Sequence, residues 1–298
     1  MHEIFVLHNV TYLNISNHSA YFATCNLTPH IQLGMGSTAE KIWVENPAEL
    51  MAGAVFYVIS FCALKYLRRD SAPLRLTSLK LLYNTAMSIF SLYTFYITLS
   101  QLIVNYRAAR PSATVDPLIC DTEFVMLTNM EWPFKIFYYS KYVEFVDTFF
   151  LVMAGVAGMG PKMTLHLYHH LVTPSIVYTS WFYPCAGVFC GPLTNSLVHV
   201  VMYAYYGISV VFPCIKKYGN LITYFQLLQF VGVIIYHTCF ILPWAWECSC
   251  NRYQLAYNFF QYAAFLLLFC LFLLSKNRDK EMKAKQANGS INGDLKKE

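Results

Sequence analysis

Long apolar runs separated by short polar segments dominate the chain. Seven of these runs approach the ~20 residues that cross a bilayer as an α-helix. They fall at about residues 50–66, 81–106, 134–156, 163–182, 193–212, 221–244 and 255–275. Tyr and Trp gather near their ends, as interfacial anchors do. The pattern predicts an all-α polytopic membrane protein with seven transmembrane helices.

Composition supports a membrane protein and excludes several other classes. Hydrophobic residues make up 57% of the chain and charged residues 12%, about half the charged share of soluble domains. A soluble protein of 298 residues could not cover its surface with so few charges. The 13 Gly, 12 Pro and 10 Cys are spread along the whole length, which excludes collagen-like, disordered and disulfide-scaffold proteins. The formal charge of +5 is modest, so nucleic acid is not expected as a partner.

The distribution of basic residues predicts the orientation in the membrane. With the N-terminus outside the cytosol, most of the 21 Lys and Arg fall in cytosolic segments, which is the bias that membrane proteins show. Residues 1–49 are then a lumenal tail, residues 50–275 the membrane domain, and residues 276–298 a basic cytosolic tail that we expect to be disordered. The lumenal tail carries four N-glycosylation sequons, at Asn9, Asn14, Asn17 and Asn26.

Polar residues inside the predicted spans are the candidate chemistry, because each needs a partner in the membrane and is functional by default. In the third span, Lys141, Glu144, Asp147 and Thr148 fall within an arc of about 120° on one helix face. This face either lines a reaction chamber or forms a self-neutralising patch that locks helices together.

Three histidines open the fourth span. His166, His169 and His170 stand at i, i+3 and i+4, so their imidazoles share one face. Imidazoles at this density indicate metal binding or acid–base and nucleophilic chemistry. Several of the nine histidines lie in the N-terminal tail, which leaves too few for a di-iron site. We therefore expect no metal, although a single ion held with Glu144 or Asp147 stays open.

The fifth and sixth spans carry narrow polar stripes, which face a protein interior rather than lipid. The stripe of the fifth span is Asn195, His199, Met202, Tyr203 and Tyr206. The stripe of the sixth span is Thr223, Gln226 and Gln229, with His237 at the angle of Gln226. Glutamines can also simply join helix to helix, and His237 is more typical of a packing histidine.

These blocks resemble, in order, the four signature blocks of the fatty acid elongases of the endoplasmic reticulum. The blocks are Lys141-x-x-Glu144-x-x-Asp147-Thr148, His166-x-x-His169-His170, Asn195-x-x-x-His199-x-x-Met202-Tyr203-x-Tyr205-Tyr206 and Thr223-x-x-Gln226-x-x-Gln229. The likeness covers about residues 50–280. It implies a very-long-chain 3-oxoacyl-CoA synthase, which condenses a long-chain acyl-CoA with malonyl-CoA to give 3-ketoacyl-CoA, CO2 and CoA. The blocks around Asn195 and Gln226 look more like the polyunsaturated branch.

The resemblance also implies an architecture and partners. The last six helices would enclose an acyl tunnel, closed at the lumenal end and open to CoA at the cytosolic end, with the first helix outside. Cys120 would pair with Cys248 or Cys250. The protein would reside in the membrane of the endoplasmic reticulum and need no cofactor beyond acyl-CoA and malonyl-CoA. Its partners would be membrane lipid and the ketoacyl-CoA reductase, dehydratase and enoyl-CoA reductase of the cycle, with a homodimer left open.

The residues suggest a mechanism. No cysteine lies beside the histidine box, so a neutral imidazole can attack the thioester itself, in a ping-pong reaction through an acyl-imidazole. By resemblance the nucleophile is His169, and His166 and His170 orient it or move protons. We expect Asn195 and His199, supported by Tyr203, to stabilise the enolate oxyanion. Glu144 and Asp147 can fix the tautomer of an imidazole, and Lys141 balances their charge.

Helix geometry sets a condition on these roles. At 1.5 Å per residue, His169 lies ~10 Å from the cytosolic border and His199 ~20 Å. If helix tilt does not bring the two together, His199 lines the tunnel instead. We expect substrate contacts from Met202, Tyr206, Thr223, Gln226 and Gln229. CoA phosphates would meet Lys162, Lys216 and Lys217, although the positive-inside bias alone also places lysines here.

Two other classes share part of this pattern. A membrane desaturase or hydroxylase also has a histidine box and a lipid substrate, and it would contain iron and require oxygen. A seven-span receptor or transporter has the same topology and a glycosylated tail, but it needs no row of imidazoles near the cytosol.

Overall fold

The computed structural model describes residues 6–7, 10–11, 47–113, 115–121, 124–158, 160–183, 187–241 and 251–294. The chain divides into two compact units, Met1–Glu45 and Asn46–Glu298. In the first unit, strands β1 (Val6–Leu7) and β2 (Val10–Thr11) pair antiparallel. The four predicted glycosylation sequons, Cys248 and Cys250 lie outside the described residues, so glycosylation and the choice of disulfide partner stay predictions.

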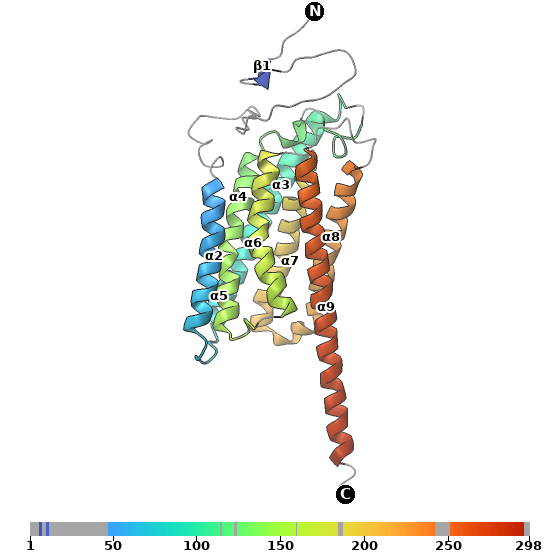
Figure 1. Ribbon diagram of the computed structural model, residues 1–298. Coiled ribbons are helices and arrows are strands. Elements are labelled where there is room, and N and C mark those ends of the chain that lie inside the picture. Colours follow the sequence, from blue (N-terminus) through green and yellow to red (C-terminus); the bar gives the residue numbers. More distant parts are fainter. Residues whose placement is uncertain are drawn as a thin grey trace, which may run out of the picture. The chain divides into compact units, whose positions relative to one another are not determined.

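The second unit is built of helices that run side by side (Figure 1). Its helices are α2 (Pro47–Leu67), α3 (Thr77–Ala109), α4 (Glu131–Val143), α5 (Phe145–Met153), α6 (Pro161–Phe182), α7 (Cys190–Val211), α8 (Gly219–Ile241) and α9 (Arg252–Asp294). Two short 3-10 helices, η1 (Val125–Leu127) and η2 (Pro213–Tyr218), lie in the connections. Each predicted apolar run is therefore helical over nearly all of its described residues, and the last helix continues well beyond its expected end at residue 275.

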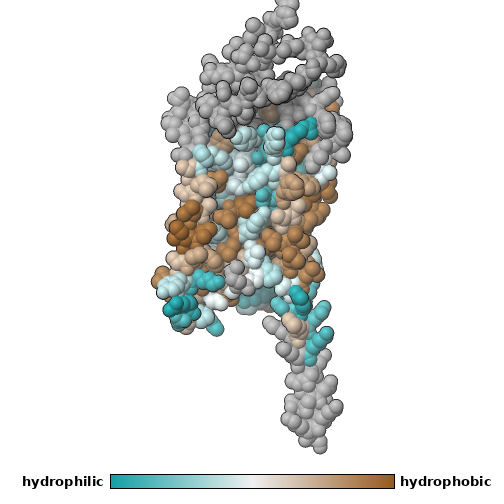
Figure 2. All heavy atoms as spheres, viewed as in Figure 1, coloured by the Kyte–Doolittle hydropathy of each residue, from teal (hydrophilic) through white to brown (hydrophobic). Residues whose placement is uncertain are grey.

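The described residues support a polytopic α-helical membrane protein. Four stretches are long and apolar enough to cross a membrane, at Pro47–Leu67, Thr77–Ala109, Pro213–Phe240 and Arg252–Met282. The third predicted span is split at Glu144 into the shorter helices α4 and α5. Large apolar side chains such as Phe56 and Leu82 are two-thirds exposed, which suits contact with lipid. Figure 2 shows such residues as a brown band around the middle of the visible face.

The prediction of a disordered tail from residue 276 is wrong. Helix α9 continues without a break to Asp294. Residues 279–287 are mostly Lys, Glu, Met, Ala and Gln and contain no Gly or Pro. These residue types have high helix propensity, so the charged segment extends the apolar helix before it.

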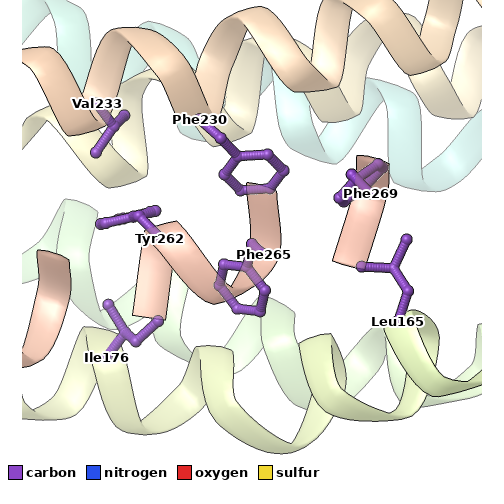
Figure 3. Close-up of a cluster of buried hydrophobic side chains, with 7 residues drawn as sticks. All are labelled: Leu165, Ile176, Phe230, Val233, Tyr262, Phe265 and Phe269. Atoms are coloured by element: carbon purple, nitrogen blue, oxygen red, sulfur yellow. The ribbon is translucent and has the colours of Figure 1, made fainter. Parts of the chain in front are cut away.

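A hydrophobic cluster joins α6, α8 and α9 (Figure 3). Its buried members are Leu165, Ile176, Phe230, Val233, Tyr262, Phe265 and Phe269. The Phe230 ring lies 5.5 Å from the Phe265 ring and 5.2 Å from the Phe269 ring, between ring centroids. Aromatic contacts at these separations add to the burial energy of the rings. The cluster thereby packs α6, α8 and α9 together on one side of the candidate site.

Helices α2, α3 and α7 complete the frame of the site. On α3, small polar residues Ser91, Thr94 and Thr98 are buried, and Ser88 Oγ donates to the Val200 carbonyl of α7 at 3.0 Å. Helix α2 packs close at Gly53, where an added Cβ would collide with the Tyr142 ring of α4. Small side chains thus allow close approach of the helices that carry the polar residues.

Cys120 is disulfide-bonded, as predicted. Its predicted partners lie outside the described residues. The other described cysteines are free, namely Cys62, Cys190, Cys214, Cys239 and Cys270.

Candidate active site

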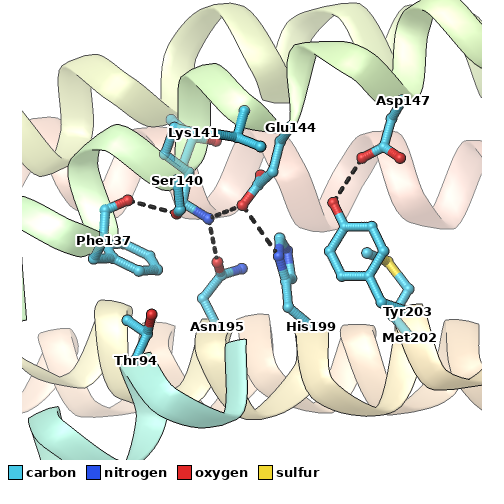
Figure 4. A network of polar contacts seen from close by, with 12 residues as sticks. Thr94, Phe137, Ser140, Lys141, Glu144, Asp147, Asn195, His199, Met202 and Tyr203 are labelled. Carbon is cyan, nitrogen blue, oxygen red and sulfur yellow. Dashed lines mark hydrogen bonds and ion pairs between the residues drawn. The ribbon is translucent and has the colours of Figure 1, made fainter. Parts of the chain in front are cut away.

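A buried ion pair links the third and fifth predicted spans (Figure 4). Lys141 of α4 donates to Glu144 Oε1 at 2.6 Å and to Asn195 Oδ1 of α7 at 2.9 Å. Lys141 and Glu144 are each only 1% exposed. Because Lys141 occupies the amide oxygen of Asn195, the amide NH2 of Asn195 is left as a donor. The pair is self-neutralising, as one sequence interpretation proposed, and it also orients a neighbouring side chain.

His199 and Tyr203 of α7 reach the same polar face. His199 Nδ1 lies 3.2 Å from Glu144 Oε1. One turn along, Tyr203 OH donates to Asp147 Oδ2 at 2.6 Å. Figure 4 shows both contacts side by side, with His199 and Tyr203 pointing from α7 toward the carboxylates. The predicted stripe of the fifth span therefore faces the predicted arc of the third.

The histidine box of α6 faces this network. The ring centroids of His166 and His170 are 4.3 Å apart, and those of His169 and His170 are 5.2 Å apart. The His169 ring lies 6.3 Å from the His199 ring. His169 and His199 are therefore close together, although the depths estimated from their positions along straight helices differed by about 10 Å. His170 Nδ1 is buried and has no hydrogen-bond partner among the described residues.

A cavity of about 690 Å³ adjoins these side chains. It reaches the end of the bundle where α6 and α8 begin, because Lys162 and Gly219 line it. A smaller pocket of about 30 Å³ continues beyond His169 toward Ser180 and His237. Both spaces are lined by a shared set of residues, His169, Asn195, Gln229 and Phe230. The catalytic candidates thus sit at a junction between a wide, partly charged cavity and a narrow, mostly apolar pocket.

Most of the predicted site residues meet in the cavity. Its lining includes Glu144, Asp147, Lys162, His166, His169, His170, Asn195, His199, Met202, Tyr203, Tyr206, Thr223, Gln226 and Gln229. Lys141 lies behind this lining, held by Glu144 and Asn195. Lys216 and Lys217 belong to η2 and are not among the lining residues. The arc of the third span therefore lines a cavity and is also a neutralised patch.

The sixth span shows both behaviours that the sequence left open. Gln226 Nε2 donates to Met202 Sδ at 3.3 Å and so joins α8 to α7. Gln226 also lines the cavity. His237 Nδ1 lies 2.8 Å from the Val233 carbonyl of its own helix, which suits a packing histidine. Its ring also lines the smaller pocket.

Sequence reasoning missed residues that come from the first two helices. Lys80 and Asn84 of α3 line the cavity, and Tyr57 of α2 hydrogen-bonds to Thr148 beside it. Lys80 and Asn84 stand at i and i+4 at the start of an apolar run, a spacing that places them on one helix face. This spacing could have identified Lys80 and Asn84 as candidate site residues. Tyr57 is an isolated tyrosine in an apolar helix, so no such indication for it exists in the sequence.

One group of side chains could hold a metal ion. Ligand atoms of Glu144, His169 and His170 lie within 4.8 Å of one another. Lys141 and His199 contact Glu144 Oε1, whereas Glu144 Oε2 is buried and has no hydrogen-bond partner among the described residues. A cation at Oε2 would still compete with the buried ammonium of Lys141 for the charge of this carboxylate. This competition favours the metal-free site that the sequence analysis expects, which stays a prediction.

The chain is similar to proteins of known family. Its sequence matches the GNS1/SUR4 family (ELO) over residues 42–285. "Very long chain fatty acid elongase 5" of Mus musculus is 30% identical to it over 250 residues, which cover 80% of this chain and 77% of the mouse protein. The proteins of the same name from Tachysurus fulvidraco and Homo sapiens are each 29% identical, over 80% of this chain and 80% and 77% of their own lengths.

Proposed function

We propose, because this chain belongs to the GNS1/SUR4 family (ELO), that it is a fatty acid elongase. It is a 3-oxoacyl-CoA synthase that condenses an acyl-CoA with malonyl-CoA and releases CO2 and CoA. One observation carries the proposal: a cavity of about 690 Å³ meets a narrow apolar pocket at His169, beside Asn195 and His199. A wide charged space suits CoA. The apolar lining of the smaller pocket suits a fatty chain, which would have to widen this pocket because about 30 Å³ holds only a few atoms.

We extend the proposal to topology and location. The helices would form seven membrane spans, with α4 and α5 together as the third. The last six would enclose the acyl tunnel, with the N-terminus in the lumen of the endoplasmic reticulum and the C-terminus in the cytosol. Lys80, Lys162 and Lys276 line the cavity and would contact the CoA phosphates. Protease protection of an epitope at each terminus, in sealed microsomes, tests this orientation.

In the first step, a ring nitrogen of His169 attacks the thioester carbonyl. The N–C bond forms, the C–S bond breaks, and an acyl-imidazole and CoA result. Glu144 holds His199 at Nδ1, which leaves Nε2 of the neutral ring as a proton acceptor. We assign to His199 the proton that His169 loses. As an imidazolium, His199 then protonates the departing CoA thiolate.

In the second step, malonyl-CoA loses CO2 and becomes an enolate. The enolate carbon attacks the acyl carbon, the N–C bond to His169 breaks, and 3-ketoacyl-CoA forms with uptake of one proton from solvent. The NH2 group of Asn195 faces the developing oxyanion, because Lys141 occupies the amide oxygen. Preorganised donors of this kind lower the barrier without reorganisation. His199 serves the oxyanion only when it is protonated.

We also propose that the acyl substrate is polyunsaturated. The support is the resemblance of the blocks around Asn195 and Gln226 to that branch. Phe230 lines both the larger cavity and the smaller pocket, and Phe265 lines the smaller pocket beside it; flat π-faces suit bent, unsaturated chains. Competition between saturated and polyunsaturated acyl-CoAs of equal length, with product ratios read by mass spectrometry, tests this choice.

Purified protein with acyl-CoA and isotopically labelled malonyl-CoA tests the reaction itself. We expect labelled 3-ketoacyl-CoA from the wild type and none from His169→Ala. A desaturase or hydroxylase would instead form product without malonyl-CoA. Its product would require oxygen, and the amount would rise with the iron content of the protein. Absence of any CoA-ester turnover by folded protein would favour a receptor or transporter.

A further inference from the structure

Helix α2 contributes a buried side chain to the candidate active site. Tyr57 is 3% exposed, and it is the buried residue of α2. Its ring packs 4.4 Å from the Phe145 ring and 5.9 Å from the His170 ring, between centroids. Its hydroxyl lies 2.9 Å from Thr148 Oγ1. The resemblance placed this first helix outside the tunnel, so a direct link to the catalytic residues was not expected.

The Thr148 hydroxyl connects Tyr57 to the histidine box. Thr148 Oγ1 lies 2.8 Å from His166 Nε2 and is itself buried, at 3% exposure. Three groups from α2, α5 and α6 therefore form one chain of hydrogen bonds. Tyr57, Thr148 and His166 make no other side-chain hydrogen bond to the described residues than these two.

Only one direction of hydrogen-bond donation along this chain gives every proton in it an acceptor. If His166 Nε2–H donated to Thr148, Thr148 would donate to Tyr57 and the phenolic proton would be left buried without an acceptor. An unmade hydrogen bond of this kind is costly. If Tyr57 donates to Thr148, Thr148 donates to His166 Nε2 and every proton in the chain has an acceptor. The neutral ring of His166 then carries its proton on Nδ1.

We propose that Tyr57 is a positioning residue of the condensation reaction, which fixes the Nδ1–H tautomer of His166 through Thr148. His166 lines the cavity, so it presents a hydrogen-bond donor there and not a base. A carbonyl oxygen of the bound CoA ester is the acceptor of matching chemistry. This inference rests on the proposed function, and it adds the first helix to the residues that set the rate.

The test compares kcat and KM of four variants with the wild type in the condensation assay. Tyr57→Phe and Thr148→Val each break the chain, and we expect kcat to fall roughly 3- to 10-fold, the effect of one net hydrogen bond, with little change in KM. Thr148→Ser keeps the hydroxyl and should restore most of kcat. The double variant Tyr57→Phe/Thr148→Val should be no slower than Thr148→Val alone, because both changes act through His166.

Tyr142→Phe is the matched control. Tyr142 of α4 packs against Gly53 of α2, and its hydroxyl hydrogen-bonds to Tyr138. Its ring touches Phe145, which lies beside His170. Tyr142→Phe keeps this ring and removes only a hydroxyl that makes no described hydrogen bond to Tyr57, Thr148 or His166. The kcat of the Tyr142→Phe variant should equal that of the wild type. Wild-type kcat for Tyr57→Phe, or effects of Tyr57→Phe and Thr148→Val that multiply in the double variant, would overturn the inference. A wild-type protein without condensation activity would instead overturn the proposed function.

Discussion

The buried pair of Lys141 and Glu144 makes a quantitative prediction about stability. Both side chains are 1% exposed, and Lys141 Nζ lies 2.6 Å from Glu144 Oε1. Lys141→Met removes the cation and leaves Glu144 as a buried charge without its partner. Breaking such a pair costs about 3–5 kcal/mol. For a protein of this size, that loss corresponds to a fall in Tm on the order of 10 °C.

The double variant Lys141→Met/Glu144→Gln separates charge from packing. Gln at position 144 has no net charge and keeps an oxygen that can accept from His199 Nδ1. The remaining loss is the donor to Asn195 Oδ1, worth about 1 kcal/mol. We therefore expect the double variant to recover most of the Tm that the single variant loses, while both lack condensation activity.

Thermal unfolding of detergent-purified protein, followed by tryptophan fluorescence, measures this difference. Glu131 and Lys135 form a more exposed pair on the same helix, so Lys135→Met is the matched control and should change Tm by no more than about 2 °C. A Lys141→Met protein as stable as the wild type, or a double variant no more stable than the single one, would refute the reasoning.

Three further predictions concern other contacts. Tyr203→Phe removes the donor to Asp147, a buried contact of 2.6 Å, and should lower kcat roughly tenfold and Tm by a few degrees, as measured by steady-state kinetics and thermal unfolding. Cys120→Ser breaks the disulfide and should lower the free energy of unfolding by about 2–5 kcal/mol; equal Tm values with and without reductant would contradict this. Glycosidase treatment should shift the gel mobility of wild-type protein but not of a variant that lacks all four sequons, which are Asn9, Asn14, Asn17 and Asn26.

The sequence predicted the helices and the faces that carry polar residues. Apolar runs reveal spans through length alone, and the i, i+3, i+4 spacing of His166, His169 and His170 placed them on one face. Opposed polar faces in a bundle must meet, because lipid gives them no partner. The contact of His199 with Glu144, and that of Tyr203 with Asp147, follow from this requirement.

The remaining features depend on packing between helices, which periodicity does not encode. The depth estimate for His169 and His199 assumed upright helices, whereas their ring centroids lie only 6.3 Å apart. The helix breaks at Glu144, between α4 and α5, although no Pro or Gly near this position predicts a break. Tyr57 resembles any tyrosine of a membrane helix until α2 docks against α5 and places it on Thr148.

Intact-protein mass spectrometry after incubation with acyl-CoA alone tests the central claim, that an imidazole carries the acyl chain. We expect a mass increase of one acyl group on the wild type, and its loss when malonyl-CoA is added. His169→Ala should show no adduct, and fragmentation of the wild type should place the acyl group on His169. An active wild-type protein that shows no adduct, or an adduct that survives malonyl-CoA, would contradict the acyl-imidazole mechanism.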